Sequence, residues 1–456
     1  MAAPVWVGID DTDGADGGCT TFALTELVET ARSSGLDLIG EPRLVRLNPN
    51  VPFKTRGNAA LSARFGIGEG SRRLQGRGRR GAIWSYGRGR GPPPHLLERF
   101  LDLAWENVRR SARLGGPGSD PALVATSRQL PAGLYRTAVA RVIDRAELVR
   151  ELEQHGAWVR ADGSGQGVVG AASAISWPAR RATWELIAYR ASERWGTPRS
   201  VDRGSVQEAQ HRFPDLFLCH DPRTRRLLVA PHTGCPILLG LRSRSRRRLA
   251  RAFAVVRSEP AERWMVFRTN QGTGDHLVPR EIADLQPFDA ARVTGQVAGP
   301  ARLLRGGHAH WTISDRAGRT LECVAFEPTK TLPRVAGGLA AGDVVEVWGG
   351  RAADPVFRVE GIRLLRPARR AGPSRPPACP RCGRRMGSIG RARGYRCRSC
   401  SLRLPPERAE WPVQRGLAPG TYHPTPSARR HLAPLGPEGV DPVPSARGLV
   451  TDLYGS

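Results

Sequence analysis

Three carboxylates follow a short apolar run near the start of the chain. Residues 5–9 are rich in β-branched side chains, which is typical of a buried strand, and Asp10, Asp11 and Asp13 come directly after them. Ligands bind at this edge of α/β sheets. Because like charges repel, such a cluster predicts a cation between the carboxylates, and Mg²⁺ with nucleotide phosphates is the usual one. The alternative is a solvated acidic turn before a helix expected over residues 22–31.

Four cysteines near the other end form two CxxC pairs. Cys379 and Cys382 are separated from Cys397 and Cys400 by fourteen residues. This spacing supplies four thiolates for tetrahedral Zn²⁺, and four protein ligands leave no open position, so the predicted zinc is structural. The other four cysteines are scattered rather than spaced as a disulfide framework, which favours a reducing, cytoplasmic location.

Two further features favour phosphate binding. Gly165 and Gly167 belong to a glycine-rich stretch before a small-residue run, where backbone N–H groups can approach a phosphate closely. A plain tight turn is the alternative. The only lysines among 70 basic residues are Lys54 and Lys330, so a compact ammonium stands where arginine dominates elsewhere.

The overall charge indicates a polyanionic partner. The 456 residues carry a formal charge of +28, with a pI near 11.3, which attracts nucleic acid first. The length allows about three to four domains. No run of 18 apolar residues and no signal-peptide pattern occur, so we expect no membrane association.

The middle of the chain predicts mixed helices and strands. Residues 66–94 are rich in glycine and arginine and are expected to form a flexible basic loop, either touching RNA or solvated. Residues 95–108 have the pattern of an amphipathic helix, and residues 183–190 also favour a helix. Short strands of an α+β module are expected at 213–218, 227–230 and 237–241.

Residues 288–366 change character. Five β-type runs, at 293–297, 310–313, 320–326, 344–348 and 357–365, are separated by turn residues. Five strands in under 80 residues favour an OB-fold barrel, although any small barrel fits the pattern. A Pro/Arg-rich linker leads to the zinc ribbon at 375–404, and residues 405–456 are expected to be a basic, Pro-rich, extended tail.

These features together favour an ATP-using enzyme that acts on RNA. The charge, the barrel and the ribbon point to nucleic acid, whereas the acidic cluster, Lys54 and the glycine-rich loop point to a nucleoside triphosphate. A non-enzymatic, single-strand nucleic-acid-binding protein is the alternative. It explains the first group of features and leaves the second group without a role.

Several longer motifs resemble those of the archaeal isoleucine-tRNA 2-agmatinylcytidine synthetases. They are distributed over nearly the whole chain and include the acidic cluster and the zinc ribbon. The others lie at 19–21, 46–49, 53–58, 183–190, 231–232, 269–277, 306–308, 327–330 and 429–432. Leu332 and Pro333 depart from the aromatic–basic pair usual in the family, and the composition of 66–94 is peculiar to this chain.

This resemblance implies a multidomain α+β enzyme. It implies a kinase-like α/β domain at 1–140, a ferredoxin-like domain at 141–280, an OB-fold at 288–366 and the zinc ribbon. The implied reaction joins agmatine to carbon 2 of the wobble cytidine of the isoleucine tRNA with a CAU anticodon, which then reads AUA. ATP phosphorylates the 2-oxo group and the amine displaces the phosphate. An enzyme of the same build acting on another amine or RNA is a further alternative.

The resemblance also implies residue roles. Asp10, Asp11 and Asp13 are assigned to Mg²⁺, and Lys54 and Arg56 to the ATP phosphates. Thr20 aligns with a family threonine that can itself take a phosphate; the alternative is that it caps the helix after Cys19.

Other polar residues have open roles. His308 and Lys330 either contact RNA or close the barrel. His232 either approaches the catalytic site or closes strand ends, with a lean to the former, and His276 stays ambiguous. Agmatine's guanidinium calls for a carboxylate or an aromatic face, but the sequence does not select one, nor does it predict the oligomeric state.

Overall fold

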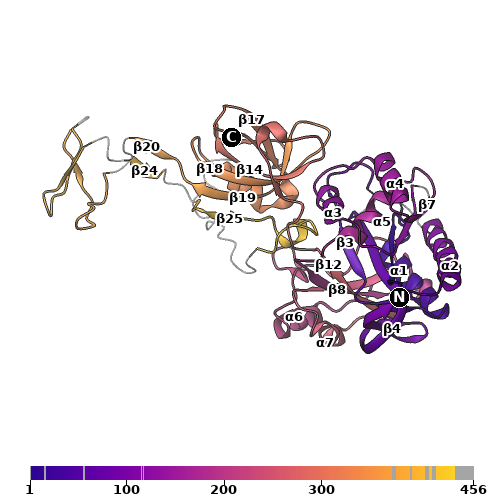
Figure 1. Ribbon diagram of the computed structural model, residues 1–456. Helices are drawn as coiled ribbons and strands as arrows, with labels where there is room; N and C mark the ends of the chain where they lie inside the picture. Colours follow the sequence, from indigo (N-terminus) through magenta and orange to yellow (C-terminus); the bar gives the residue numbers. More distant parts are fainter. Residues whose placement is uncertain are drawn as a thin grey trace. The chain divides into compact units, whose positions relative to one another are not determined.

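Figure 1 shows the computed structural model, which describes residues 2–14, 17–54, 57–114, 116, 118–371, 376–390, 393–405, 410–412 and 417–436. The chain divides into two compact units. The first comprises Met1–Val278, Gln286–Ala291 and Thr425–Glu438, and the second comprises the remainder. Each unit is described by itself.

A ten-stranded sheet forms the centre of the first unit. Its main order is β11-β8-β12-β3-β4-β1-β6-β7, and β2 and β5 pair beside β4. The strands are β1 (Val5–Asp10), β2 (Asp37–Ile39), β3 (Arg43–Arg46), β4 (Ala59–Gly78), β5 (Gly81–Arg90), β6 (Ala122–Thr126), β7 (Trp158–Ala161), β8 (Thr183–Tyr189), β11 (Ile237–Ser243) and β12 (Arg263–Thr269). The segments expected to form separate kinase-like and ferredoxin-like domains thus contribute strands to one sheet.

Helices cover both faces of this sheet (Figure 1). Because side chains alternate along β1, Val7 and Ile9 pack with α1 while Trp6 packs with α5. The helices α6 and α7 cover β8 and β11 on the face away from α1. The helices are α1 (Thr20–Ser33), α2 (Pro94–Arg113), α3 (Ala132–Ala138), α4 (Arg145–Gln154), α5 (Gly167–Ser176), α6 (Arg203–Arg212) and α7 (Leu249–Val255). The helices predicted over 22–31 and 95–108 are confirmed.

Two predicted conformations are wrong. Residues 66–94 do not form a flexible loop, because β4 and β5 pair antiparallel through most of this segment. Residues 183–190 form β8 rather than a helix. Leu186, Ile187 and Ala188 are buried on both faces of the sheet, and a short, continuously apolar run does not distinguish a central strand from a buried helix.

The strands predicted around residue 220 are only partly present. Residues 213–218 form a loop in which Leu216 makes an isolated bridge to Ser243. Residues 227–230 contribute only to the short pair β9 (His220–Asp221) and β10 (Arg226–Leu227), whereas the strand at 237–241 is confirmed as β11.

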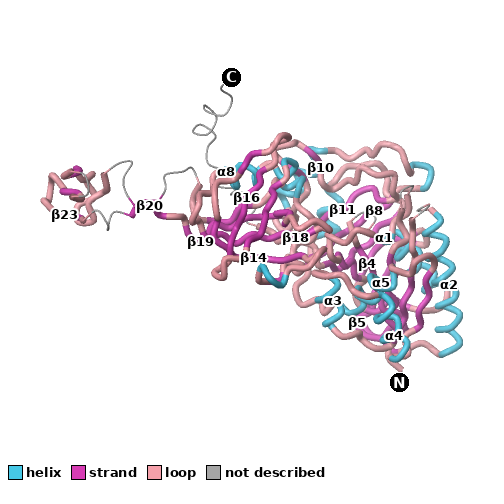
Figure 2. Tube along the Cα trace, turned by 90° about the horizontal axis from the view of Figure 1, so that it is seen from above, coloured by secondary structure: helices cyan, strands magenta, loops and turns pink. Residues whose placement is uncertain are grey.

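A closed barrel of five strands lies in the second unit. Pairing follows β14-β18-β19-β17-β16 and returns from β16 to β14. Figure 2 shows these strands in magenta, with α8 (Thr331–Gly337) beside β16. The strands of this region are β13 (Val278–Pro279), β14 (Ala290–Val297), β15 (Arg302–Leu303), β16 (Ala309–Ser314), β17 (Thr320–Ala325), β18 (Val344–Arg351) and β19 (Phe357–Arg366). All five predicted runs are therefore confirmed as strands.

The cysteine-rich segment forms a small three-stranded sheet in the order β21-β22-β23. Its strands and the neighbouring ones are β20 (Arg369–Ala371), β21 (Gly387–Ser388), β22 (Tyr395–Arg396), β23 (Arg403–Leu404) and β24 (Glu410–Pro412). Single 3₁₀ turns occur at Ser192–Arg194, Ile282–Asp284, Glu327–Thr329 and Pro426–Ala428. None of the helices in the described ranges is both long enough and apolar enough to cross a bilayer.

The expectation of an extended tail over 405–456 is wrong for the part that the structure describes after residue 417. Strand β25 (Gly420–Tyr422) pairs with β19 of the barrel. Residues 425–436 belong to the first unit, where the Gly272 N–H donates to the His431 carbonyl at 2.8 Å. Leu432 is buried in the same cluster as Trp177. This segment is therefore an integral part of the first unit.

Candidate active site

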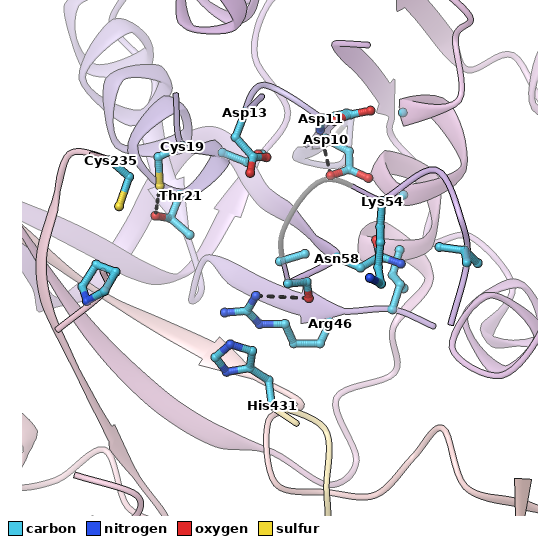
Figure 3. Close-up of a pocket in the computed structure, with 18 of the residues that line it drawn as sticks. Asp10, Asp11, Asp13, Cys19, Thr21, Arg46, Lys54, Asn58, Cys235 and His431 are labelled. Atoms are coloured by element: carbon cyan, nitrogen blue, oxygen red, sulfur yellow. Dashed lines mark hydrogen bonds between the residues drawn. The ribbon is translucent and has the colours of Figure 1, made fainter. Parts of the chain in front are cut away.

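A cavity of about 350 Å³ lies in the first unit, where β1 ends and α1 begins (Figure 3). Its walls come from strands, from the helices α1 and α5, from loops and from the segment 425–436. The predicted site residues that line it are Asp10, Asp11, Asp13, Thr20, Lys54 and Gly167. The cavity thus brings together residues that are distant in the sequence.

Two glycines place the first carboxylate of the cluster. Gly8 lies on the face of β1 that meets α5, and a Cβ there would collide with the carbonyl oxygen of Ala171. A Cβ at Gly170 would collide with the carboxylate of Asp10. Helix α5 therefore lies directly against β1 and against the Asp10 side chain, which only glycine permits at these two positions.

Gly170→Ala tests this packing. Inside a helix, replacing glycine by alanine ordinarily stabilises by about 1 kcal/mol. Here the new Cβ meets Asp10, so we expect no gain in thermal stability and a loss of activity of about tenfold or more, because the carboxylate must move. Melting temperature and product formation measure the two effects. Gly133→Ala in α3 is the matched control, since its Cβ would have only one neighbour, at 3.8 Å, and full activity is expected.

Burial and mutual repulsion perturb the acidic cluster. Burial, followed by the nearby Asp11 carboxylate, raises the pKa of Asp10 well above its usual value, although the Asp11 N–H donates to Asp10 Oδ1 at 2.8 Å. Burial, then Asp13 and Asp120, raises the pKa of Asp11 to about 7. Asp11 also has φ of +57°, a left-handed conformation that costs energy for this residue. All three carboxylates can therefore be ionised together at neutral pH only if a bound cation offsets their repulsion.

The carboxylates suit Mg²⁺ only together with a nucleotide. Within the described ranges, the four cysteines are the one group that brings three or more ligand atoms within 4.8 Å of one another, and the aspartates do not converge in this way. Protein-bound Mg²⁺ typically takes one or two carboxylates and completes its shell with water and phosphate oxygens. Asp10 and Asp11 fit that pattern.

Thr20 contacts the same cluster. It is the first residue of α1, and its hydroxyl donates to Asp13 Oδ1 at 3.3 Å. The N-cap position belongs to Cys19, and the structure shows no side-chain capping bond there. The helix-capping alternative for Thr20 is therefore not what the structure shows; its hydroxyl is held beside a carboxylate on the cavity wall.

The glycine-rich loop wraps around an acid that sequence reasoning missed. The Ser164 N–H donates to Asp120 Oδ1 at 3.1 Å, and the Gly165 N–H donates to the Asp162 carbonyl at 3.2 Å. Gly165 does not line the cavity, whereas Gly167 does. The tight-turn alternative thus describes Gly165, while Gly167 stays a candidate for phosphate contact.

Basic side chains lie across the cavity from the aspartates (Figure 3). Burial lowers the pKa of Arg46, whose Nη1 donates to the Gly57 carbonyl at 3.3 Å. The Nε of Arg46 is buried, and no residue in the described part of the chain accepts from it. A buried, unsatisfied guanidinium donor at a cavity wall is suited to an anionic ligand.

A chain of hydrogen bonds fixes His431 beside Arg46. Glu185 pairs with Arg242 at 3.2 Å and accepts a bond from the Gln271 amide nitrogen. The Gln271 amide oxygen then lies 3.0 Å from His431 Nδ1, so this nitrogen carries the proton and Nε2 keeps its lone pair. The positive charge of Arg46, then burial, then Arg242, hold the pKa of His431 well below its usual value. His431 is therefore a neutral imidazole of defined tautomer.

The predicted phosphate-binding loop is only partly described. Lys54 lines the cavity, and burial, followed by the charge of Arg430, lowers its pKa. Arg56 lies outside the described residues. The sequence alone indicates no role for five further cavity-side residues: Arg46, Arg242, Glu185, Gln271 and His431. Membership of the motifs at 46–49, 183–190, 269–277 and 429–432 was the one available signal for four of them.

Two histidines of the first unit do not reach the cavity. His232 is exposed, and its Nε2 accepts from Arg226 Nε at 2.9 Å, although the neighbouring Pro231 does line the cavity. The prediction that His232 approaches the catalytic site is therefore wrong. His276 is fully buried and is not among the lining residues.

The two candidate RNA-binding residues of the barrel share one neighbour. His308 Nδ1 accepts from the Glu327 N–H at 2.9 Å, and Lys330 pairs with the Glu327 carboxylate. Lys330 is exposed, and Phe326, whose ring meets the edge of His308, is 39% exposed. The local contacts thus support a structural role, and the exposure leaves the ammonium accessible to a phosphate.

The four cysteines converge as predicted for zinc. The Sγ atoms of Cys379 and Cys400 are 3.3 Å apart, and those of Cys382 and Cys397 are 3.5 Å apart. All four sulfur atoms lie within 4.8 Å of one another. Backbone N–H groups, that of Cys400 first, lower the pKa of Cys397 to about 6, which favours the thiolate that zinc binds.

Cys382→Ser should reduce bound zinc from about one ion per chain to a small fraction, because three thiolates and a hydroxyl bind zinc far more weakly. Elemental analysis of purified protein measures this. Cys323→Ala, which removes a buried barrel thiol outside the set, should retain the metal. Full zinc content in the Cys382→Ser protein would contradict the assignment.

Comparison with known proteins covers the chain almost completely. Three family models match: the TiaS TCKD domain at residues 6–161, the TiaS FLD domain at 165–276 and the TiaS C-terminal zinc ribbon domain at 376–417. The isoleucine-tRNA 2-agmatinylcytidine synthetase TiaS of Archaeoglobus fulgidus is 33% identical over 434 residues, covering 94% of this chain and 96% of the relative. That of Methanopyrus kandleri is 34% identical over 445 residues, covering 94% and 95%.

Solved structures agree with these relatives. A crystal structure of TiaS in complex with its isoleucine tRNA and ATP matches with a TM-score of 0.76 and 32% identity, covering 96% of this chain and 99% of that one. A complex of TiaS with the same tRNA, AMPCPP and agmatine matches with a TM-score of 0.75 and 29% identity over the same shares.

The matches, together with the barrel, the zinc ribbon and the acidic–basic cavity, identify a multidomain enzyme of the tRNA-modifying class. The three matched family domains follow one another along this single chain, and the relatives align with nearly all of it. The chain belongs to the TiaS family, the isoleucine-tRNA 2-agmatinylcytidine synthetases.

Proposed function

We propose that this protein joins agmatine to carbon 2 of the wobble cytidine of the isoleucine tRNA with a CAU anticodon, using ATP, so that the tRNA decodes AUA. The observation that carries the proposal is the end-to-end match to the family, at 33% identity over 94% of the chain. The cavity supports it, because residues of several family motifs line one space.

The first step of the proposed reaction makes the 2-oxo group a leaving group. A ring oxo group leaves poorly, and its phosphate ester leaves well. Phosphoryl transfer depends on charge neutralisation and in-line positioning rather than on covalent help from the protein. Asp10 and Asp11 would hold Mg²⁺, which supplies neutralisation of the ATP phosphates, and Lys54 and Arg56 would add positive charge.

The second step needs an uncharged amine and an anion site for the departing phosphate. The guanidinium group of Arg46 lies across the cavity from the aspartates and suits that anion, because no residue in the described part of the chain accepts from its buried Nε. The Thr20 hydroxyl, which donates to Asp13, would be the phosphate acceptor that the family resemblance implies.

The proposed domains have different roles in binding ATP and tRNA. Residues 1–140 would act as the ATP-binding, kinase-like domain and 141–280 as the ferredoxin-like domain. The barrel, with His308 and Lys330, and the ribbon would bind the tRNA in the cytoplasm, while the cytidine turns out of its stack, since carbon 2 is otherwise inaccessible.

Mass spectrometry of the anticodon nucleoside tests the proposal. Purified protein, ATP, agmatine and unmodified tRNA with the CAU anticodon should give a cytidine heavier by agmatine less water, and none without ATP. A different added mass would indicate another amine. An unmodified cytidine, with tRNA bound and zinc present, would favour the non-enzymatic alternative.

A further inference from the structure

One face of the hairpin β4–β5 carries four large side chains. Arg72 is paired with Tyr86 and Leu74 with Trp84, and the register between these pairs is regular. Directly paired residues of antiparallel strands project to the same face, as do residues two apart on one strand. Arg72, Leu74, Trp84 and Tyr86 therefore form one continuous surface, which we call the hairpin platform.

The hairpin platform is exposed although its side chains are largely apolar. Leu74 is 39% exposed, and Trp84 and Tyr86 are half-buried and lie outside the buried cluster that packs β1 and β4 against α1. The opposite face is covered, with Ile83 and Ser85 buried. Folding thus leaves two aromatic rings accessible on one side of a sheet whose other side is core.

Cations accompany the rings. The guanidinium of Arg72 lies 4.6 Å from the centroid of the Trp84 ring, and Arg88 follows Tyr86 by two residues and is exposed. Neighbouring hairpin arginines are paired with acids: Arg73 with Glu41, Arg79 with Glu262 and Arg90 with Glu69. In the described part of the chain, no acid forms an ion pair with Arg72 or Arg88, although Glu69, which is bonded to Arg90, lies opposite Arg88 in the strand register. The two cations nearest the exposed rings, Arg72 and Arg88, are therefore the hairpin arginines that can most readily bind an external anion.

A purely structural role accounts for part of this arrangement. A Cβ at Gly68 would collide with the Tyr86 ring, so the ring lies against that glycine and shields the strand. This contact does not involve Trp84 and does not explain why Leu74 and Arg72 stay in solvent beside it.

We propose that the hairpin platform binds unpaired nucleotides of RNA, with Trp84 and Tyr86 stacking on bases and Arg72 and Arg88 contacting phosphates. Alternating aromatic and cationic side chains on a strand surface are the usual means of holding a single strand without sequence selection. The overall charge of +28 favours RNA over a protein partner. Taking that RNA to be the tRNA substrate rests on the proposed function.

Binding of unmodified tRNA with the CAU anticodon, measured over a series of salt concentrations, tests the two contacts separately. For Arg72→Gln/Arg88→Gln we expect the slope of log affinity against log salt to fall by about 1.4 to 1.8, since two phosphate contacts are lost. For Trp84→Ala/Tyr86→Ala we expect an unchanged slope and affinity about tenfold or more lower at every salt concentration, because stacking is not ionic.

Arg99→Gln/Arg110→Gln is the matched control. Both arginines are exposed on α2, and their removal changes the net charge equally. The proposal is overturned if this control lowers the slope as much as the hairpin pair, or if the aromatic variant binds tRNA within twofold of wild type with an unchanged melting temperature. Nucleoside analysis of the wild-type reaction distinguishes the two proposals, because tRNA can bind the platform whether or not cytidine is modified.

Discussion

Asp11→Asn should lower the rate of product formation about a thousandfold while tRNA affinity stays within twofold of wild type. The substitution keeps the shape of the side chain and removes one charge from the end of β1. Electrostatic groups aimed at a reacting phosphoryl group typically contribute factors of this size. The pKa of Asp11, raised to about 7, shows that its charge is held at a cost, which a bound cation would offset.

Single-turnover product formation and filter binding measure the two quantities for Asp11→Asn. Asp102→Asn is the matched control, because this exposed aspartate of α2 is not among the cavity residues, and it should leave both quantities unchanged. Activity of Asp11→Asn within threefold of wild type would show that the carboxylate neither holds a metal nor supports phosphoryl transfer.

Local spacing explains which parts of the site were predictable. The acidic cluster lies at the end of a strand, in the four residues from Asp10 to Asp13, and the cysteines form CxxC pairs. A short window of sequence therefore contains each group. Arg46, Glu185 and His431 come from three distant segments, and each alone is an ordinary polar residue. They line one cavity only because β3 and β8 lie in one sheet with β12 between them, and because the segment 425–436 bonds to Gly272 and Gly274.

The amino-acid composition explains the largest error in the predicted fold, the flexible loop over 66–94. The many glycines and arginines of 66–94 resemble low complexity, yet glycines such as Gly66 and Gly76 sit where a neighbouring backbone leaves no space for a Cβ. Close approach of strands, rather than flexibility, accounts for them. The barrel was predictable because its strands alternate apolar and polar residues, with one face buried.

Ending the chain after Pro424 should reduce product formation at least a hundredfold, whereas ending it after Gly436 should leave activity within twofold. The shorter chain loses His431, which lines the cavity, and Leu432, which packs in the cluster around Trp177. The longer chain keeps every residue of this segment that contacts the first unit in the described structure. Equal activity of the two truncations would exclude a catalytic contribution from the segment.

His431→Ala separates the imidazole from the rest of the segment. Leu432 and the backbone bonds to Gly272 and Gly274 remain, so we expect a melting temperature within a few degrees of wild type. Product formation should fall about tenfold or more, since Arg46 and Gln271 lose the group that separates and orients them. A variant with wild-type rate would restrict the segment to a packing role.

The pH dependence of stability tests the charge state of His431. Arg46 and Arg242 hold its pKa well below 6.5 in the folded state, whereas the unfolded chain titrates near 6.5. Below about pH 6.5 the unfolded state therefore binds a proton that the native state does not, and the free energy of unfolding must fall as pH decreases. Denaturant unfolding of wild type and of His431→Gln, compared between pH 7.5 and pH 5.5, should show a smaller loss of stability in the variant, because glutamine does not titrate. The same loss in both proteins would mean that the pKa of His431 is equal in the native and unfolded states, so that at pH 5.5 the native protein presents a cation, rather than a lone pair, to the cavity.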